Sequence, residues 1–149
     1  MPLRGPARVY DGDTIRIGGT SIRIWGIDAV ELKQTCDLDG RSIACGRMAR
    51  DAMAQIINGR DVACTPRGRS YKRVVATCRV DGVDVAAQMA RLGMAQDYAR
   101  YSHGFYAADE HIARVARAGI WAMAFDAPSL WRACNLPQRK NRRPASCMS

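Results

Sequence analysis

Alternating apolar and polar residues near the start of the chain constrain its fold more than any other feature of the sequence. Every second residue is isoleucine in Thr14–Ile17 and again in Ser21–Ile24, which is typical of strands with one buried face. The Gly18-Gly19 pair between the two segments predicts a hairpin turn. Gly26 ends the alternation at a point where a strand can bulge or bend. Residues 7–27 are therefore expected to form three strands.

Helical periodicity begins after these strands. Apolar residues between positions 44 and 57 recur at helical spacing and end at Asn58-Gly59, a typical helix stop. Two more strands are expected at 61–65 and 74–80, joined by a basic loop, and two more helices at about 84–92 and 105–118. The apolar face of the last helix consists of Ala108, Ile112, Val115 and Ala116.

The order of these elements, β-β-β-α-β-β-α-α, predicts an α+β fold. Such an order is compatible with a five-stranded OB-fold β-barrel with three flanking helices. A chain of 149 residues is long enough for one domain and short for two, so residues 1–136 are assigned to a single domain. Residues 28–43 are expected to be a loop, and the periodicity fades after Trp121. Residues 137–149 are expected to form a short, basic and mobile C-terminal tail.

The charge of the chain points to a polyanionic partner. The formal net charge is +9, and lysine occurs only at positions 33, 72 and 140, so arginine supplies most of it. The planar guanidinium group matches phosphate oxygens, although a basic surface can also simply keep a small domain in solution. No apolar run approaches the ~20 residues of a membrane-spanning helix, so no membrane partner is expected.

Six cysteines favour disulfide bonds and hence an oxidising compartment. No Cys-x-x-Cys motif is present and neither His103 nor His111 lies near a pair of cysteines, which argues against a zinc site. The candidate disulfides are Cys36–Cys45, Cys64–Cys78 and Cys134–Cys147, the last of which the sequence leaves open. A periplasmic or secreted location is expected, although no signal peptide is visible in these residues. Six reduced thiols in a cytoplasmic protein are the alternative.

Three acidic residues near strand ends are candidates for binding a hard cation. Asp13 lies in the Asp11–Thr14 motif, which is by itself a common hairpin signal. Asp28 and Glu31 directly follow a predicted strand. The carboxylates of Asp13 and Asp28, with a backbone carbonyl, would supply oxygen ligands of the kind that Ca²⁺ prefers.

Two arginines would supply the complementary charge. Arg23 lies in a predicted strand and Arg73 in the basic loop, and either residue could also be a solvated surface charge. Cleavage of a phosphodiester needs a cation and fixed donors to stabilise charge on phosphorus, and a carboxylate to orient or deprotonate water. Arg23 and Arg73, with Glu31 as the carboxylate, provide a candidate for each of these roles.

With these motifs in this order, the chain resembles the staphylococcal nuclease family over roughly residues 7–121. The matching segments are Asp11-Gly12-Asp13-Thr14, Arg23 followed by Trp25–Glu31, Tyr71-Lys72-Arg73, the helix at 83–93 and Gly119-Ile120-Trp121. The resemblance implies an OB-fold barrel and a Ca²⁺-dependent nuclease that is not specific for the sugar. It further implies that DNA and RNA are cut at the P–O5′ bond, which leaves 3′-phosphate ends.

The resemblance also implies roles for individual residues. It assigns metal binding to the side chains of Asp13 and Asp28 and to the backbone carbonyl of Ala29. The residues that would act on the phosphate and the attacking water are Arg23, Glu31 and Arg73. The residues that would line the nucleotide site are Tyr71, Lys72, Tyr98 and Tyr101.

Two positions depart from the family pattern. Val30 stands where the family has proline, so the loop that holds Glu31 is less stiff, and Lys72 stands where the family has glycine. Neither change removes a functional group, so activity is expected. A Cys36–Cys45 disulfide would close a loop just after Glu31, and we hypothesise that it takes over the stiffening role of the proline.

Two other functions are compatible with the sequence. A non-catalytic OB module would bind single-stranded nucleic acid through its arginines and tyrosines. A disulfide-stabilised interaction domain would carry its basic charge incidentally. The nuclease is the preferred interpretation, and it is expected to act as a monomer on DNA and RNA, preferably where these are single-stranded or locally unpaired.

Overall fold

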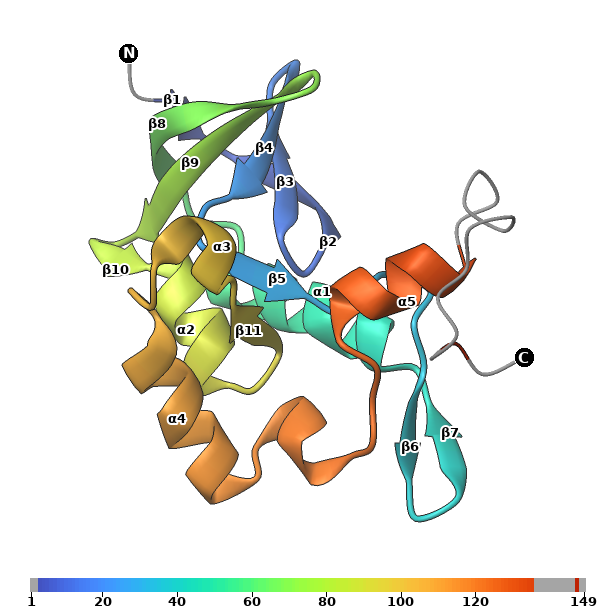
Figure 1. Cartoon of the computed structure of the whole chain (residues 1–149). Helices are drawn as coiled ribbons and strands as arrows, with labels where there is room; N and C mark the ends of the chain where they lie inside the picture. The colour runs from blue at the N-terminus through green and yellow to red at the C-terminus, as the bar shows by residue number, and fades with distance from the viewer. Residues whose placement is uncertain (1–2, 136–146, 148–149) are drawn as a thin grey trace.

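A mixed sheet and a group of helices occupy opposite halves of the computed structural model, which describes residues 3–135 and residue 147 (Figure 1). This arrangement confirms the predicted α+β class. The predicted basic tail at 137–149 lies outside the described residues, with the exception of Cys147.

The main sheet has seven strands. They are β1 (Leu3–Gly5), β2 (Ala7–Asp11), β3 (Thr14–Ile17), β4 (Thr20–Ile24), β8 (Val62–Ser70), β9 (Arg73–Val80) and β10 (Val83–Asp84). Their order is β1-β8-β9-β4-β3-β2, and β10 pairs with β9. Only β4 and β9 run parallel to each other; the other pairs are antiparallel.

The β2–β3–β4 meander follows the isoleucine alternation. Ile15 pairs with Ile22 across β3 and β4, and both side chains are buried, as is that of Ile24. The intervening Arg16 is exposed and Arg23 is half-buried. A period of two therefore places the apolar side chains on the core face, as the sequence predicts.

Gly26 directs the chain out of the main sheet. Its φ of +84° is a conformation that favours glycine, and a Cβ atom there would lie 2.7 Å from Cε2 of the buried Tyr106. Beyond it, β5 (Ile27–Ala29) pairs with β11 (Ala95–Asp97) in a separate two-stranded sheet. Between residues 3 and 135 no hydrogen-bonded pairing joins β1 to β2. An open seven-stranded sheet with separate strand pairs therefore stands in place of the expected five-stranded OB-fold barrel.

Two segments predicted as loops contain strands. Residues 28–43 include the hairpin of β6 (Cys36–Leu38) and β7 (Arg41–Ile43), which has too few residues to show a period. The basic loop predicted at 66–73 is mostly strand, because β8 and β9 continue past a register shift between Pro66 and Gly68.

The helices are more numerous than the three that were expected. They are α1 (Cys45–Ile57), α2 (Val85–Arg91), α3 (Ala99–Ser102), α4 (Ala107–Ala116), the 3-10 helix η1 (Gly119–Ala122) and α5 (Pro128–Asn135). The elements that the sequence missed, α3, η1 and α5, have eight residues or fewer. None of the helices in the described part of the chain is long and apolar enough to cross a membrane.

The orientation of α4 differs from the prediction. Ile112 and Val115 of the predicted apolar face are 49% and 72% exposed, and Ala113 is the buried residue of this helix. The neighbouring Asp109 and Glu110 face inward instead, because Asp109 accepts a hydrogen bond from Arg91 and Glu110 accepts one from the backbone N–H of Asp97. Polar contacts between elements thus decide which side of α4 is covered.

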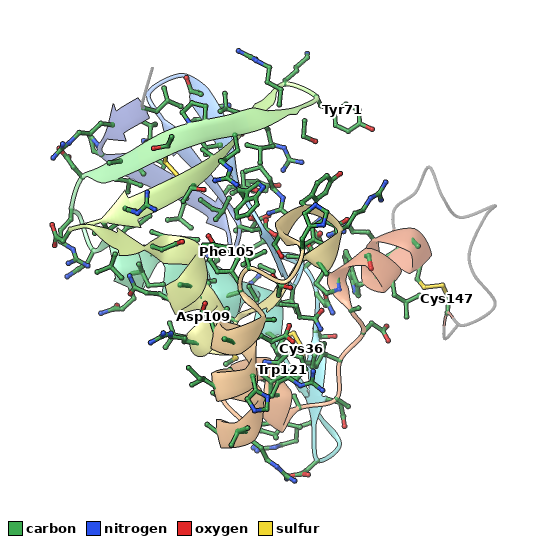
Figure 2. All side chains as sticks on the ribbon, turned by 60° about the vertical axis from the view of Figure 1, so that its left-hand side comes forward. Cys36, Tyr71, Phe105, Asp109, Trp121 and Cys147 are labelled. Carbon is green, nitrogen blue, oxygen red and sulfur yellow. A yellow bond between two sulfur atoms is a disulfide. The ribbon has the colours of Figure 1, made fainter. Side chains whose placement is uncertain are left out.

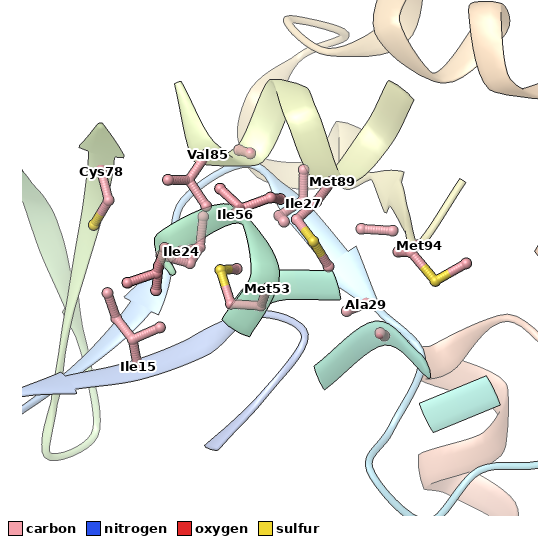
Figure 3. Close-up of a cluster of buried hydrophobic side chains, with 14 of the residues drawn as sticks. Ile15, Ile24, Ile27, Ala29, Met53, Ile56, Cys78, Val85, Met89 and Met94 are labelled. Carbon is pink, nitrogen blue, oxygen red and sulfur yellow. The ribbon is translucent and has the colours of Figure 1, made fainter. Parts of the chain in front are cut away.

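The core lies between the sheet, α1 and α2 (Figure 3). Ile15 and Ile24 from the sheet face Met53 of α1 and Met89 of α2 in this cluster. The turn between β2 and β3 reaches the same cluster, since a Cβ atom on Gly12 would lie 2.7 Å from that of Ala29. The core therefore fixes the position of this turn relative to β5.

Three disulfides connect elements of the described residues. Cys64–Cys78 links facing positions of β8 and β9, and Cys36–Cys45 links β6 to the first residue of α1. Cys134 of α5 is bonded to Cys147 (Figure 2). These are the three pairings that the sequence suggested as candidates.

Gly46 provides a test of how closely α1 packs on the loop after β5. A Cβ atom at this position would lie 2.0 Å from the backbone oxygen of Glu31. We expect Gly46→Ala to lower the free energy of unfolding by about 1–3 kcal/mol, because the loop must shift. Gly19→Ala is the control, since nothing lies within 4 Å of a Cβ atom there. Urea denaturation that gives both variants the same stability would refute this close packing.

Candidate functional site

A pocket of about 500 Å³ opens where the β8–β9 hairpin, the segment from β4 to β5, α3 and α5 meet. Its polar lining residues are Asp11, Asp13, Arg23, Glu31, Arg69, Ser70, Tyr71, Arg73, Tyr98, Tyr101 and Arg132. Figure 1 shows that these elements are distant in the sequence, from the blue β4 to the red-orange α5. Most of the residues singled out from the sequence therefore border one cavity.

Asp13 joins the β2–β3 turn to β5. Its Oδ2 accepts a hydrogen bond of 2.8 Å from the backbone N–H of Ala29, and its Oδ1 accepts one of 3.3 Å from the hydroxyl of Thr14. The backbone N–H of Asp13 donates in turn to Oδ1 of Asp11, at 3.0 Å. The side chains of Asp11, Asp13 and Thr14 are buried, and those of Asp11 and Asp13 line the pocket.

Arg23 holds the bend that follows β4. Its Nη1 donates to the carbonyl oxygens of Ile24 and Ile27, each at 2.9 Å, so the guanidinium bridges the two sides of the bend at Gly26. The same group lies 3.4 Å from Oδ2 of Asp13 and 3.4 Å from Oδ1 of Asp28. Arg23 therefore brings the two predicted metal carboxylates to the same point.

A second guanidinium, from Arg132 of α5, binds the same acidic group. Its Nη1 and Nη2 donate to Oδ1 and Oδ2 of Asp28 at 3.0 and 3.2 Å, and its Nη1 donates to Oε1 of Glu31 at 2.6 Å. This two-pronged geometry is the strong form of an arginine–carboxylate pair. Arg132 was not predicted as a site residue.

Burial keeps the acidic side chains from ionising as readily as they do in water. Desolvation raises the pKa of Asp28 and that of Glu31 above their usual values, although Arg132 opposes the rise in both. Desolvation and the neighbouring charge of Asp13 raise the pKa of Asp11 to about 7. Burial lowers the pKa of Arg132, but the hydrogen bonds and the charges of Asp28 and Glu31 together outweigh burial and raise this pKa above its usual range. The pocket thus brings carboxyl groups with raised pKa values together with four arginines, Arg23, Arg69, Arg73 and Arg132.

The β8–β9 hairpin contributes two further arginines to the lining of the pocket, Arg69 and Arg73. Nη1 of Arg73 lies 3.5 Å from the hydroxyl of Thr14, which connects Arg73 to Asp13 through one side chain. Tyr71 is 97% exposed at the tip of the hairpin with a φ of +56°, and Figure 2 shows it projecting from the molecule. Lys72 is also exposed in this turn and does not line the pocket.

Tyr98 and Tyr101 line the pocket from the side of α3. Their rings meet edge to face with centroids 5.2 Å apart, and Tyr101 is 55% exposed. The backbone N–H of Tyr98 donates to the carbonyl oxygen of Gly26, at 2.8 Å. Both tyrosines are therefore fixed to the same bend as Arg23 and leave ring surface open to the pocket.

Sequence reasoning missed two residues that shape the site. Arg132 lies beyond the last clear periodicity, and its only local signal is Pro128 followed by the helically spaced Leu130, Trp131 and Cys134. Gln34 is fully buried and accepts a hydrogen bond from the N–H of Glu31 while donating to the carbonyl of Asp126. Nothing in its sequence context distinguishes it from other residues of the predicted loop.

The acidic residues match a calcium ion in donor type. Hard carboxylate oxygens are the ligands that Ca²⁺ prefers, and Arg23 holds those of Asp13 and Asp28 close to the same point. Asp13 and Asp28, with the backbone of Ala29 beside them, are the residues that would hold it. In the described part of the chain no three acidic, histidine or cysteine side chains are arranged to hold a metal ion. Two of the acidic side chains, Asp28 and Glu31, accept hydrogen bonds from Arg132 instead.

The comparison with known families identifies the class of protein. The chain belongs to the staphylococcal nuclease homologue family, which it matches over residues 21–123. The Asp11–Thr14 motif lies before this span. Contacts of Asp13 with Ala29 and Arg23 connect the motif to the rest of the site.

A relative among the curated proteins is the succinoglycan biosynthesis protein ExoI of Rhizobium meliloti (strain 1021). The two chains are 37% identical over 124 residues, which covers 80% of this chain and 65% of the relative. The chain thus spans slightly less than two thirds of the length of that relative.

The raised pKa of Asp11 predicts how stability depends on pH. The pKa of Asp11 is 3.8 in the unfolded chain and about 7 in the folded protein. As the pH rises between these two values, the unfolded state loses the proton before the folded state does, so the free energy of unfolding falls. Asp11→Asn keeps the oxygen that accepts from Asp13 but cannot ionise. With chelator present, we expect the Tm of Asp11→Asn minus that of wild type to increase by several degrees from pH 4 to pH 8. Each kcal/mol of stability corresponds to about 2–4 °C in Tm.

The control for this measurement is Asp61→Asn, which removes the charge of an exposed carboxylate. A difference in Tm between Asp11→Asn and wild type that stays constant across the pH range would contradict the raised pKa.

Proposed function

We propose that the protein is a calcium-dependent nuclease that hydrolyses phosphodiester bonds of DNA and RNA. The observation that carries this proposal is that Asp13, Arg23, Glu31 and Arg73 line one pocket in a member of this family, with Asp28 in contact with Arg23. A basic chain with a net charge of +9 suits a polyanionic substrate.

Arg23 and Arg73 are the residues that would bind the scissile phosphate. Arg23 is held by two backbone carbonyls, so its guanidinium is oriented before substrate arrives. Arg73 is only loosely held by Thr14, at 3.5 Å, and keeps donors available to a phosphate. Because an arginine does not readily give up a proton, Arg73 would stabilise charge on the leaving oxygen while water supplies the proton.

Glu31 is the residue that would orient and deprotonate the attacking water. The oxygen of this water would bond to phosphorus as the P–O5′ bond breaks, which leaves a 3′-phosphate and a 5′-hydroxyl. Burial raises the pKa of Glu31 and so makes it a better proton acceptor than an exposed carboxylate. When bound at Asp13 and Asp28, Ca²⁺ would supply the positive charge that attracts and polarises the phosphate.

The tyrosines and the exposed hairpin would bind the rest of the nucleotide chain. Tyr98 and Tyr101 offer ring surface at the pocket, and Tyr71 and Lys72 at the hairpin tip would contact the neighbouring phosphate or base. Base stacking is tolerant of sequence and requires unpaired bases, which favours single-stranded or locally opened substrates. Action as a monomer and a location outside the reducing cytoplasm, supported by the three disulfides, are part of the proposal.

The pairing of Arg132 with Asp28 and Glu31 favours one alternative. If this pairing persists in all conditions, the carboxylates cannot serve in catalysis, and the protein would be a binding module for single-stranded nucleic acid.

Incubation with plasmid and with single-stranded nucleic acid separates these two functions. We expect degradation in Ca²⁺ and none in chelator, and we expect Glu31→Gln to lower the rate by about a hundredfold or more because the proton acceptor is lost. Asp61→Asn is the matched control, because this exposed residue does not line the pocket. Tight, salt-dependent binding without cleavage in Ca²⁺ would select the binding module instead.

A further inference from the structure

We propose that Arg132 is a built-in competitor of the divalent cation, so that α5 acts as an autoinhibitory latch which Ca²⁺ must displace. This inference rests on the proposed function, since it concerns the same carboxylates. The inference goes further in that a residue beyond the segment that matches the family, which ends at residue 123, regulates the site.

The contact of Arg132 with the acidic residues is direct and partly shielded from water. Its side chain is 27% exposed, compared with 6% for Asp28 and 26% for Glu31. Both carboxylate oxygens of Asp28 accept from Arg132, and Oδ1 also faces Arg23 at 3.4 Å. Ion pairs in such surroundings are screened less by salt than surface pairs.

The segment that carries Arg132 is anchored beside the loop that carries Glu31. The backbones of Asp37 and Ala124 exchange two hydrogen bonds of 2.8 Å. Gln34 then links the N–H of Glu31 to the carbonyl of Asp126, at 3.1 and 2.7 Å. α5 is therefore attached to the site at points other than the ion pair itself.

The C-terminal end of α5 is partly buried as well. Cys134, two residues after Arg132, is buried, and its disulfide joins α5 to Cys147. The contacts of Ala124 and Asp126 before α5 lower the entropic cost of placing Arg132 at the carboxylates, because less freedom is lost when the contact forms.

Arg132 and a metal ion cannot use Asp28 in the same way at the same time. Ca²⁺ binds by direct contact with carboxylate oxygens, and both oxygens of Asp28 already accept from the guanidinium. Glu31 is likewise engaged through Oε1 at 2.6 Å, and this pairing opposes the rise of its pKa and so weakens it as a proton acceptor. Ca²⁺ binding and release of Arg132 are therefore coupled, and each must oppose the other.

Calorimetric titration with Ca²⁺, without nucleic acid, measures this competition directly. We expect Arg132→Ala and Arg132→Gln to lower the Kd for Ca²⁺ about tenfold or more, because a charge-assisted pair no longer has to be broken. Arg132→Lys keeps the charge but lacks the two-pronged geometry, so its Kd should fall between these variants and wild type.

Arg91→Ala is the matched control, since it removes the same charge from an exposed pair with Asp109, and it should bind Ca²⁺ as wild type does. A Kd that Arg132→Ala leaves unchanged or raises would overturn the latch and leave the proposed nuclease intact. A failure of wild type and all Arg132 variants to bind Ca²⁺ would overturn both the latch and the calcium dependence of the proposed function.

Discussion

The buried guanidinium of Arg23 is the contact on which the rest of the site depends. It bridges the carbonyls of Ile24 and Ile27 across the bend at Gly26, and it faces Asp13 and Asp28. Without it, two buried carboxylates would lose a partner, a loss that typically costs several kcal/mol. Arg23 thus stabilises both the bend at Gly26, where β5 leaves the main sheet, and the meeting of the acidic residues.

Charge balance connects this arrangement to function. Among the described residues, ion pairs join Asp13, Asp28 and Glu31 to two guanidinium groups, those of Arg23 and Arg132. The raised pKa values of Asp11, Asp28 and Glu31 reflect their burial. A cluster of this kind is stable only if protons or cations compensate it. The guanidinium of Arg132 on α5 provides one such positive charge.

Much of the fold and the site could be predicted because the signals are local. Isoleucine alternation identified β3 and β4, and helical spacing identified α1 to within a residue. Motif order identified Asp13, Arg23 and Glu31, which the structure brings to one pocket. The remainder depends on contacts between distant segments: the orientation of α4 follows from the partners of its acidic residues, and Arg132 meets residues about a hundred positions away.

A crystal structure of the protein grown in Ca²⁺ would show whether the ion takes the place of Arg132. We expect an ion within about 2.3–2.6 Å of carboxylate oxygens of Asp13 and Asp28, with the guanidinium of Arg132 withdrawn from Asp28. An ion bound elsewhere, or Arg132 still paired with both oxygens of Asp28 at saturating Ca²⁺, would contradict this expectation.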